Sequence, residues 1–345
     1  MRLGKIIVDI DGLDLSKNDI DLLQHPFIGG VILFARNFLS VDQIIHLIES
    51  IKQIRSPSLI IYVDQEGGRV QRFKEEMTVL PAISMLGEKY KNDGEDSLIL
   101  SKELGWLIGY ELRCIGIDVN TAPVLDINYN RSNVMQGRCF SEDPKDTSLL
   151  SEAFIIGTKQ SGISSICKHY PGHGYAKTDS HIELPQDNRG LKTIFNDDLM
   201  PYKKAIKLGI EGIMTSHVLY KNIDQYPPTL SSKWLQILKN DLRYKGLIFS
   251  DDLSMNALKD FGDIEDNVLK SLEVGCDCIF ICNNRKKVEH ILDNLVLDMS
   301  DDISNKLINL SRNRIKDNFK INKRRLSVIN NLKKIADKKQ IEIKL

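Results

Sequence analysis

The sequence predicts an α/β protein built as a single (β/α)8 barrel of the TIM type, with additional helices at its C-terminal end. Eight short apolar runs, rich in β-branched residues, alternate with stretches of helical apolar spacing. Several of these runs are continuously apolar, which is typical of strands covered on both faces. No glycine-rich dinucleotide-binding loop accompanies them, so a closed barrel is favoured over an open doubly wound sheet.

The expected strands follow one another at regular intervals along most of the chain. They are residues 5–10, 30–34, 59–64, 116–124, 163–169, 212–218, 246–251 and 276–282. Between them, residues 41–54 and 96–115 carry apolar side chains at the i, i+3, i+4 spacing of amphipathic helices. No shift in composition marks a boundary within residues 1–300, so we expect this range to form one barrel domain.

Residues 301–345 have a different character from the rest of the chain. They contain 13 Lys or Arg and 5 Asp or Glu, a net charge of +8, and the other 300 residues therefore carry −8. Their apolar residues recur at helical spacing. We expect a basic helical extension packed on the barrel with its charged faces in solvent. The alternative is a tail that binds nucleic acid or a partner.

The composition limits the classes of function. The chain has 345 residues, 42% of them hydrophobic, with 47 basic and 47 acidic residues, which argues against wholesale binding to nucleic acid or to an anionic membrane. No apolar run reaches the roughly 18 residues of a membrane span, and the first apolar run is too short for a signal peptide. Six cysteines without a Cys-x-x-Cys pair predict buried thiols rather than disulfides or a metal site, and hence a cytoplasmic protein.

Charged and imidazole side chains stand at the carboxyl ends of several expected strands. The active sites of (β/α)8 barrels lie at this end, so residues delivered there by independent strands are candidates for one common site. A single residue of this kind would more simply be a surface or capping residue. The third, fifth, sixth and seventh runs end in Asp64, Lys168, His169, His217, Asp251 and Asp252.

Two pairs of residues suggest particular roles. Asp179 and His181 lie in a glycine-flanked loop, where the carboxylate can orient the imidazole and raise its basicity. A turn closed by Asp179 and Ser180, with the histidine as a bystander, fits the same residues equally well. Asp251 is placed to act as a nucleophile, a base or a metal ligand, and Asp252 to cap the following helix. From the local sequence, either aspartate is a candidate for the chemistry.

Charged side chains near the expected barrel mouth indicate the kind of ligand. Arg72, Arg138 and Lys168, together with Asp64, suit a polyhydroxylated substrate, because charged groups form strong directional hydrogen bonds to hydroxyls. Such bonds also discriminate against analogues that lack the hydroxyl. The residues therefore favour a small carbohydrate.

Several segments together resemble the bacterial β-N-acetylhexosaminidases of glycoside hydrolase family 3 that recycle peptidoglycan. The resemblance extends in the family's order from residue 30 to residue 255, which makes it specific. The segments are GVILFARNF (30–38), VDQEGGRVQRF (63–73), GIDVNTAPVLD (116–126), GRCFSEDP (137–144), CKHYPGHG (167–174), TDSHIELP (178–185), MTSHV (214–218) and FSDDLSM (249–255).

The resemblance implies a retaining exo-β-N-acetylglucosaminidase that acts on anhydromuropeptide fragments without a metal or cofactor. Asp251 matches the family's nucleophile, which forms a covalent glycosyl-aspartate. His181 matches its general acid/base, with Asp179 as the orienting partner. The chain departs from the usual family pattern at Cys139 and Tyr170 and in the loop before Asp179, whose length is preserved. Because of the altered loop, the family's preference for the leaving group is not carried over to this chain. The implied sugar-binding positions are Asp64, Arg72, Arg138, Lys168, His169 and His217.

Three alternatives use the same region of the sequence. A glycoside phosphorylase would employ the same residues with phosphate as the acceptor. A metal-dependent barrel hydrolase would use His169, His173, His181, His217 and Asp251, but such barrels usually carry a His-x-His pair after the first strand, and none is present here. A degenerate barrel that only binds sugars would require loss of Asp251 and of the Asp179–His181 pair, and these residues are present.

Overall fold

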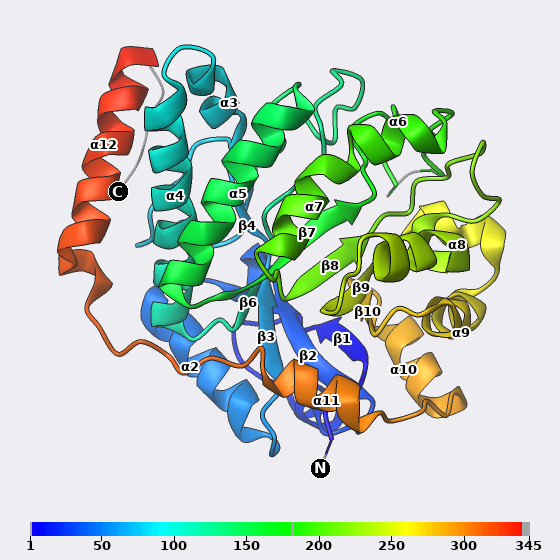
Figure 1. Ribbon diagram of the computed structural model, residues 1–345. Helices are drawn as coiled ribbons and strands as arrows, with labels where there is room; N and C mark the ends of the chain where they lie inside the picture. The colour runs from blue at the N-terminus through cyan, green and yellow to red at the C-terminus, as the bar shows by residue number, and fades with distance from the viewer. Residues whose placement is uncertain (1, 181–182, 340–345) are drawn as a thin grey trace.

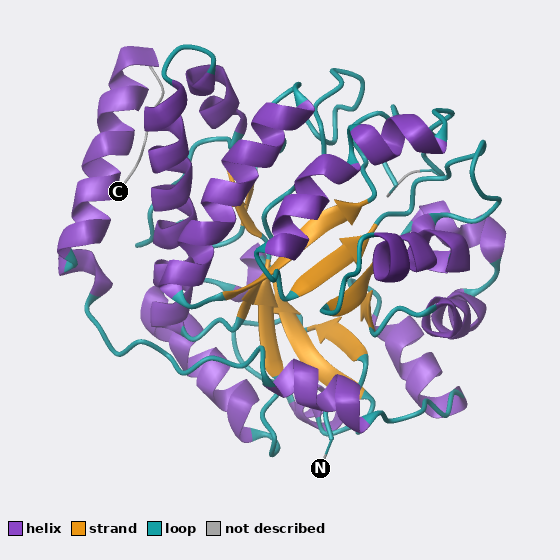
Figure 2. Cartoon of the chain, viewed as in Figure 1, coloured by secondary structure: helices purple, strands orange, loops and turns teal. Residues whose placement is uncertain are grey.

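A computed structural model describes the backbone of residues 2–180 and 183–339, with side chains to residue 334. Eight parallel strands close into a barrel in the order β1-β10-β9-β8-β7-β6-β3-β2, surrounded by helices (Figures 1 and 2). Each strand overlaps one of the expected runs, so the predicted closed barrel is confirmed. The strands are β1 (Ile6–Asp9), β2 (Ile28–Leu33), β3 (Ile60–Val63), β6 (Val119–Asn120), β7 (Ser164–Tyr170), β8 (Gly212–Thr215), β9 (Leu247–Asp252) and β10 (Cys278–Ile281).

Aromatic side chains fill the inside of the barrel. Tyr62 of β3 lies 6.1 Å from Phe249 of β9 and 5.6 Å from Phe280 of β10, measured between ring centroids. Because β3 and β9 are not neighbours in the sheet, the contact between Tyr62 and Phe249 crosses the interior. The barrel centre is therefore a packed core rather than a pore.

The helices begin and end where the sequence provides caps. Asp143 accepts hydrogen bonds from the first turn of α5, whose first residue is Pro144, and Gly162 ends this helix at φ +79°. The two helices expected from apolar spacing correspond to α2 and α4. The helices are α1 (Lys17–Leu23), α2 (Val41–Gln53), α3 (Ser84–Tyr90), α4 (Gly94–Ile115), α5 (Pro144–Ser161), α6 (Leu191–Asn196), α7 (Leu199–Lys207), α8 (Ser232–Gln236), α9 (Ile264–Val274), α10 (Arg285–Asn294), α11 (Asp301–Ile308) and α12 (Lys323–Lys339).

A short antiparallel hairpin, β4 (Gln65–Gly67) and β5 (Val70–Gln71), directly follows β3 and was not predicted. Its turn depends on two glycines with left-handed backbone, Gly67 at φ +106° and Gly68 at φ +57°. A Cβ atom on Gly67 would lie 2.8 Å from the carbonyl oxygen of Pro81. The hairpin is therefore folded tightly against the segment that follows it.

The last helices pack on the barrel. Leu307 and Leu310 are buried in the same apolar cluster as the strands, and α12 runs alongside α4 (Figure 1). All six cysteine side chains are buried. Within the described part of the chain, none of the helices combines the length and apolarity needed to span a bilayer.

Candidate active site

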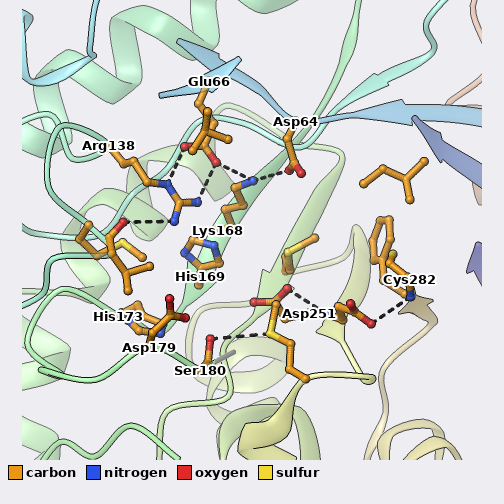
Figure 3. A pocket seen from close by; sticks show the side chains of 18 of the residues that line it. Asp64, Glu66, Arg138, Lys168, His169, His173, Asp179, Ser180, Asp251 and Cys282 are labelled. Atoms are coloured by element: carbon orange, nitrogen blue, oxygen red, sulfur yellow. Dashed lines mark hydrogen bonds and ion pairs between the residues drawn. The ribbon is translucent and has the colours of Figure 1, made fainter. Parts of the chain in front are cut away.

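The carboxyl ends of the strands surround a cavity of about 360 Å³ (Figure 3). Seven of the nine predicted site residues line this cavity: Asp64, Arg72, Arg138, Lys168, His169, Asp179 and Asp251. His217 is not among the lining residues, and His181 lies outside the described residues. The lining also includes Glu66, which was not predicted, and His173, which was predicted only in the metal-dependent alternative.

Asp64, which follows β3, is held by two cations. Its Oδ1 atom lies 2.7 Å from Lys168 Nζ, and its Oδ2 atom lies 2.9 Å from Arg72 Nη2. Thr121 also donates a hydrogen bond to Oδ1. Burial alone would raise the pKa of Asp64, but Lys168 and Arg72 outweigh it and hold the pKa below its usual value. The carboxylate is therefore an ionised hydrogen-bond acceptor in a fixed orientation.

Glu66 in the hairpin forms the second half of this charge network. Arg138 donates to both of its oxygens, at 2.7 and 2.8 Å, and Lys168 Nζ lies 2.8 Å from Oε1. Burial opposes ionisation of Glu66, but Arg138 and Lys168 lower its pKa to about 2. Lys168 thus joins Asp64 to Glu66 (Figure 3). This arrangement places charged hydrogen-bond donors and acceptors side by side in the cavity wall.

His169 and His173 come from the carboxyl end of β7 and share Asp126 as a partner. The Nδ1 atom of His169 lies 2.7 Å from Asp126 Oδ2, which assigns the proton of a neutral ring to Nδ1. The backbone N–H of His173 donates to Asp126 Oδ1 at 2.7 Å. Lys168 and His169 both line the cavity, and the peptide bond between them is cis. Asp126 therefore fixes this part of the wall.

His173 is a buried, neutral imidazole in the cavity wall. Only 2% of the residue is exposed, and neither ring nitrogen has a hydrogen-bond partner among the described residues. Burial and the neighbouring His169 lower its pKa to about 4. His173 was predicted only as a ligand in the metal-dependent alternative. Among the described residues, no group of three or more His, Cys, Asp or Glu is arranged to hold a metal ion.

Asp251, near the end of β9, lines the cavity with its carboxylate. Its Oδ1 atom accepts a hydrogen bond from the backbone N–H of Asp252 at 2.8 Å. Burial would raise its pKa, but His169, His217, this N–H group and Lys168 together keep the pKa below its usual value. The side chain is therefore an ionised carboxylate that lines the cavity.

Asp252, in contrast, is occupied by structural hydrogen bonds. Its Oδ1 atom accepts from the backbone N–H groups of Ser254, at 2.9 Å, and Cys282, at 3.0 Å, and its Oδ2 atom accepts from the Ser254 hydroxyl at 2.8 Å. Burial raises its pKa to about 6. Of the two aspartates left open by the sequence, Asp251 is therefore the one with a carboxylate less engaged in structural hydrogen bonds, and Asp252 holds the end of the strand in place.

His217 lies behind the cavity wall. Its Nδ1 atom is 2.9 Å from the Thr229 hydroxyl, and its Nε2 atom is 3.0 Å from the carbonyl oxygen of Asp252. The residue is fully buried. Because both ring nitrogens are engaged, the structure gives His217 a supporting position beside the carboxylates rather than one in the cavity lining.

The loop after β7 brings Asp179 and Ser180 to the same cavity. The carbonyl oxygen of Ser180 accepts a hydrogen bond from the N–H of Ala257 at 3.1 Å, which ties this loop to the segment after β9. The Glu183 N–H donates to the carbonyl oxygen of Asp179 at 3.1 Å. Asp179, from the loop after β7, and Asp251, from β9, therefore line one cavity (Figure 3).

Comparisons with known proteins agree with this geometry. A model of the glycosyl hydrolase family 3 N-terminal domain matches residues 4–316. Two proteins named β-hexosaminidase are similar in sequence: that of Nitrosospira multiformis is 41% identical over 300 residues, and that of Nitrosomonas eutropha is 42% identical over 301 residues. In each case 87% of this chain and 86% of the relative are covered.

Solved structures show the same fold. The crystal structure of NagZ from Neisseria gonorrhoeae in complex with N-trifluoroacetyl-D-glucosamine has a TM-score of 0.92 and 33% identity, covering 97% of this chain and 99% of that one. A glycoside hydrolase family 3 β-N-acetylglucosaminidase from Paenibacillus has a TM-score of 0.78 and 29% identity, covering 96% of this chain and 60% of that one. The chain therefore belongs to glycosyl hydrolase family 3, in which its sequence relatives include β-hexosaminidases.

Proposed function

We propose that the protein is a retaining exo-β-N-acetylglucosaminidase that releases terminal N-acetylglucosamine from peptidoglycan-derived anhydromuropeptides. The observation that carries this proposal is the division of the cavity into two chemical parts. An ionised Asp251 lines one part, and the network of Asp64, Glu66, Arg138 and Lys168 lines the other. A sugar held by its hydroxyls at the network would present its anomeric carbon to Asp251.

The reaction follows in two displacements. A carboxylate oxygen of Asp251 bonds to C1 while the bond from C1 to the leaving oxygen breaks, and His181, oriented by Asp179, gives that oxygen a proton. Water then bonds to C1, the ester to Asp251 breaks, and His181 takes the proton from the water. Configuration at C1 is inverted twice and therefore retained. Asp64, Arg72, Arg138, Lys168 and His169 bind the sugar throughout.

The nucleophile is tested by trapping. A 5-fluoro glycosyl fluoride of N-acetylglucosamine should label the protein on the peptide that contains Asp251, because the fluorine slows release of the glycosyl-enzyme. Asp251→Ala should lose the label and most of its turnover on p-nitrophenyl N-acetylglucosaminide, by several orders of magnitude. Asp252→Asn is the matched control, because an amide oxygen can still accept from Ser254 and Cys282. Normal turnover in Asp251→Ala would refute the assignment.

The acid/base and the acceptor are tested separately. His181→Ala should lose little activity on substrates with good leaving groups, which need no protonation, and much more on natural glycosides. Equal losses on both would contradict the acid role. Turnover that requires phosphate and yields N-acetylglucosamine 1-phosphate would identify a phosphorylase instead.

The proposed surroundings are those of the cytoplasm. The six cysteine side chains are buried free thiols, which fits a reducing compartment. The proposed partner is the small carbohydrate substrate alone, with neither nucleic acid nor membrane, as the balance of 47 basic and 47 acidic residues suggests.

A further inference from the structure

We propose that Arg325, in the C-terminal helix α12, is a positioning residue for the sugar site. It acts through Glu111 and Thr78 on the β4–β5 hairpin, and through the hairpin it acts on Arg72. The inference rests on the proposed function, because Arg72 is taken to bind the sugar. Arg325 lies beyond residues 4–316, the range matched by the family model.

The first link is a buried ion pair between α12 and α4. Arg325 Nε lies 2.5 Å from Glu111 Oε1, and the side chains are 6% and 5% exposed. The Arg325 guanidinium also lies 5.0 Å from the centroid of the Phe319 ring. At this depth each charge depends on the other, because a single buried charge is strongly unfavourable.

The second link joins this pair to the segment after the hairpin. Glu111 accepts two hydrogen bonds from Thr78, one from the hydroxyl at 2.6 Å and one from the backbone N–H at 3.1 Å. Arg325 Nη2 donates to the same hydroxyl at 3.1 Å. Thr78 is fully buried, so its position is set by the Glu111–Arg325 pair.

The third link runs from Thr78 to the hairpin itself. Gln71, the last residue of β5, donates from Nε2 to the carbonyl oxygens of Thr78, at 2.8 Å, and Phe73, at 3.0 Å. Its Oε1 atom accepts from the N–H of Leu80 at 2.9 Å. The buried Gln71 side chain thus fastens the strand to both sides of the following loop.

The last link is Arg72, the next residue along the chain. Its backbone N–H donates to Gln65 Oε1 at 2.9 Å, and its guanidinium lies 2.9 Å from Asp64 Oδ2 in the cavity. The steps from Arg325 to Gln71 are therefore short polar contacts, the step from Gln71 to Arg72 is the chain itself, and Arg325, Glu111, Thr78 and Gln71 are all buried. Without Arg325, Glu111 would be a buried carboxylate without its cation. Moving it toward water would release Thr78.

The same helix offers a matched control. Arg324 pairs with Glu103 of α4 through two contacts, at 2.8 and 2.9 Å, and lies 4.1 Å from the Trp106 ring. This pair also joins α12 to α4, but it is more exposed, at 38% and 26%, and none of its described hydrogen bonds reaches the hairpin. Loss of Arg324 therefore weakens the packing of α12 on α4 but leaves the hydrogen bonds of Thr78 in place.

The experiment compares Arg325→Met, Arg325→Lys and Arg324→Met in the full chain. For each, KM and kcat on p-nitrophenyl N-acetylglucosaminide, the inhibition constant of N-acetylglucosamine and the melting temperature are measured. Arg325→Met should raise KM and the inhibition constant about 3- to 30-fold with a smaller change in kcat. Arg325→Lys should recover part of this loss. Arg324→Met should lower the melting temperature and leave both constants within about twofold.

Thr78→Val provides a second route if Arg325→Met does not fold. It removes the shared hydroxyl and keeps the ion pair, and it should raise KM in the same direction. Unchanged sugar binding in either folded variant would overturn the inference. The proposed function fails in a different way, since a wild-type protein that is not labelled at Asp251 would refute the glycosidase mechanism itself.

Discussion

Ionised side chains line one part of the cavity. Asp64 and Glu66 face Arg72, Arg138 and Lys168, with ion-pair distances of 2.7 to 2.9 Å. Removing one member leaves its partners as uncompensated buried charges, so substitutions here affect stability as well as binding. Glu66 is one example, because its pKa moves from 4.5 to about 2.

We predict that Glu66→Gln destabilises the protein in a pH-dependent way. A carboxyl whose pKa is lowered on folding contributes stability above its unfolded value, and this contribution disappears as pH falls through the folded value. For a shift from 4.5 to about 2 it is on the order of 3 kcal/mol. Urea unfolding at several pH values should show that the variant has a lower free energy of unfolding than the wild type. This difference should be largest above pH ~4.5 and should disappear toward pH ~2. A difference in the free energy of unfolding that does not change with pH would refute this account.

The sequence located site residues best where they end a strand. Asp64, His169 and Asp251 belong to this kind, since parallel strands deliver their carboxyl ends to one place. Glu66 was missed because its partner Arg138 is 72 residues away, and the local sequence around either residue does not indicate that they pair. Asp126 was missed for the same reason, because its partner His169 is 43 residues away.

Among the secondary-structure elements, the β4–β5 hairpin is the one on which the site depends most. It carries Glu66 and leads into Arg72, and its turn requires left-handed backbone at Gly67. The hairpin escaped prediction because strands of three and two residues are too short to show a two-residue alternation. Helices such as α2 were predicted because thirteen residues show their period several times.

We predict that Gly67→Ala destabilises the protein by more than about 1 kcal/mol, because alanine at positive φ is strained. Its Cβ atom would also lie 2.8 Å from the Pro81 carbonyl oxygen. KM for the sugar should rise, because Glu66 and Arg72 shift with the turn. Gly94→Ala is the control. Gly94 is the first residue of α4, and the nearest atom to an added Cβ would be Tyr90 Cε2 at an ordinary distance of 3.6 Å. Equal stability of the two variants in denaturant titrations would contradict this assignment.

At the scale of the whole molecule, the barrel closes through pairing of its first and last strands, with Ile6 opposite Ile279 and Val8 opposite Ile281. Two large apolar clusters share this frame. One contains Trp106 of α4 and the other Trp234 of α8. The sequence predicted the eight strands and their order along the chain, and eight βα repeats without a dinucleotide-binding glycine loop favoured a closed barrel.

We predict that the barrel unfolds as one cooperative unit. The chain has two tryptophans, one in each cluster, so Trp106→Phe and Trp234→Phe leave one fluorescent reporter at a time. In each variant, the urea midpoint from fluorescence should equal the midpoint from far-UV circular dichroism, because a closed sheet cannot lose one side alone. Different midpoints within one variant would show that the two clusters unfold separately.

The pairing of β1 with β10 also sets an order of events during synthesis. One edge of β1 finds β2 soon after it leaves the ribosome, but its other edge stays open until residue 281 has been made. At ~5–20 residues per second this wait lasts roughly 15 to 55 s. An open edge is a template for pairing with foreign strands. The nascent chain therefore has to shield its first strand until its last one arrives.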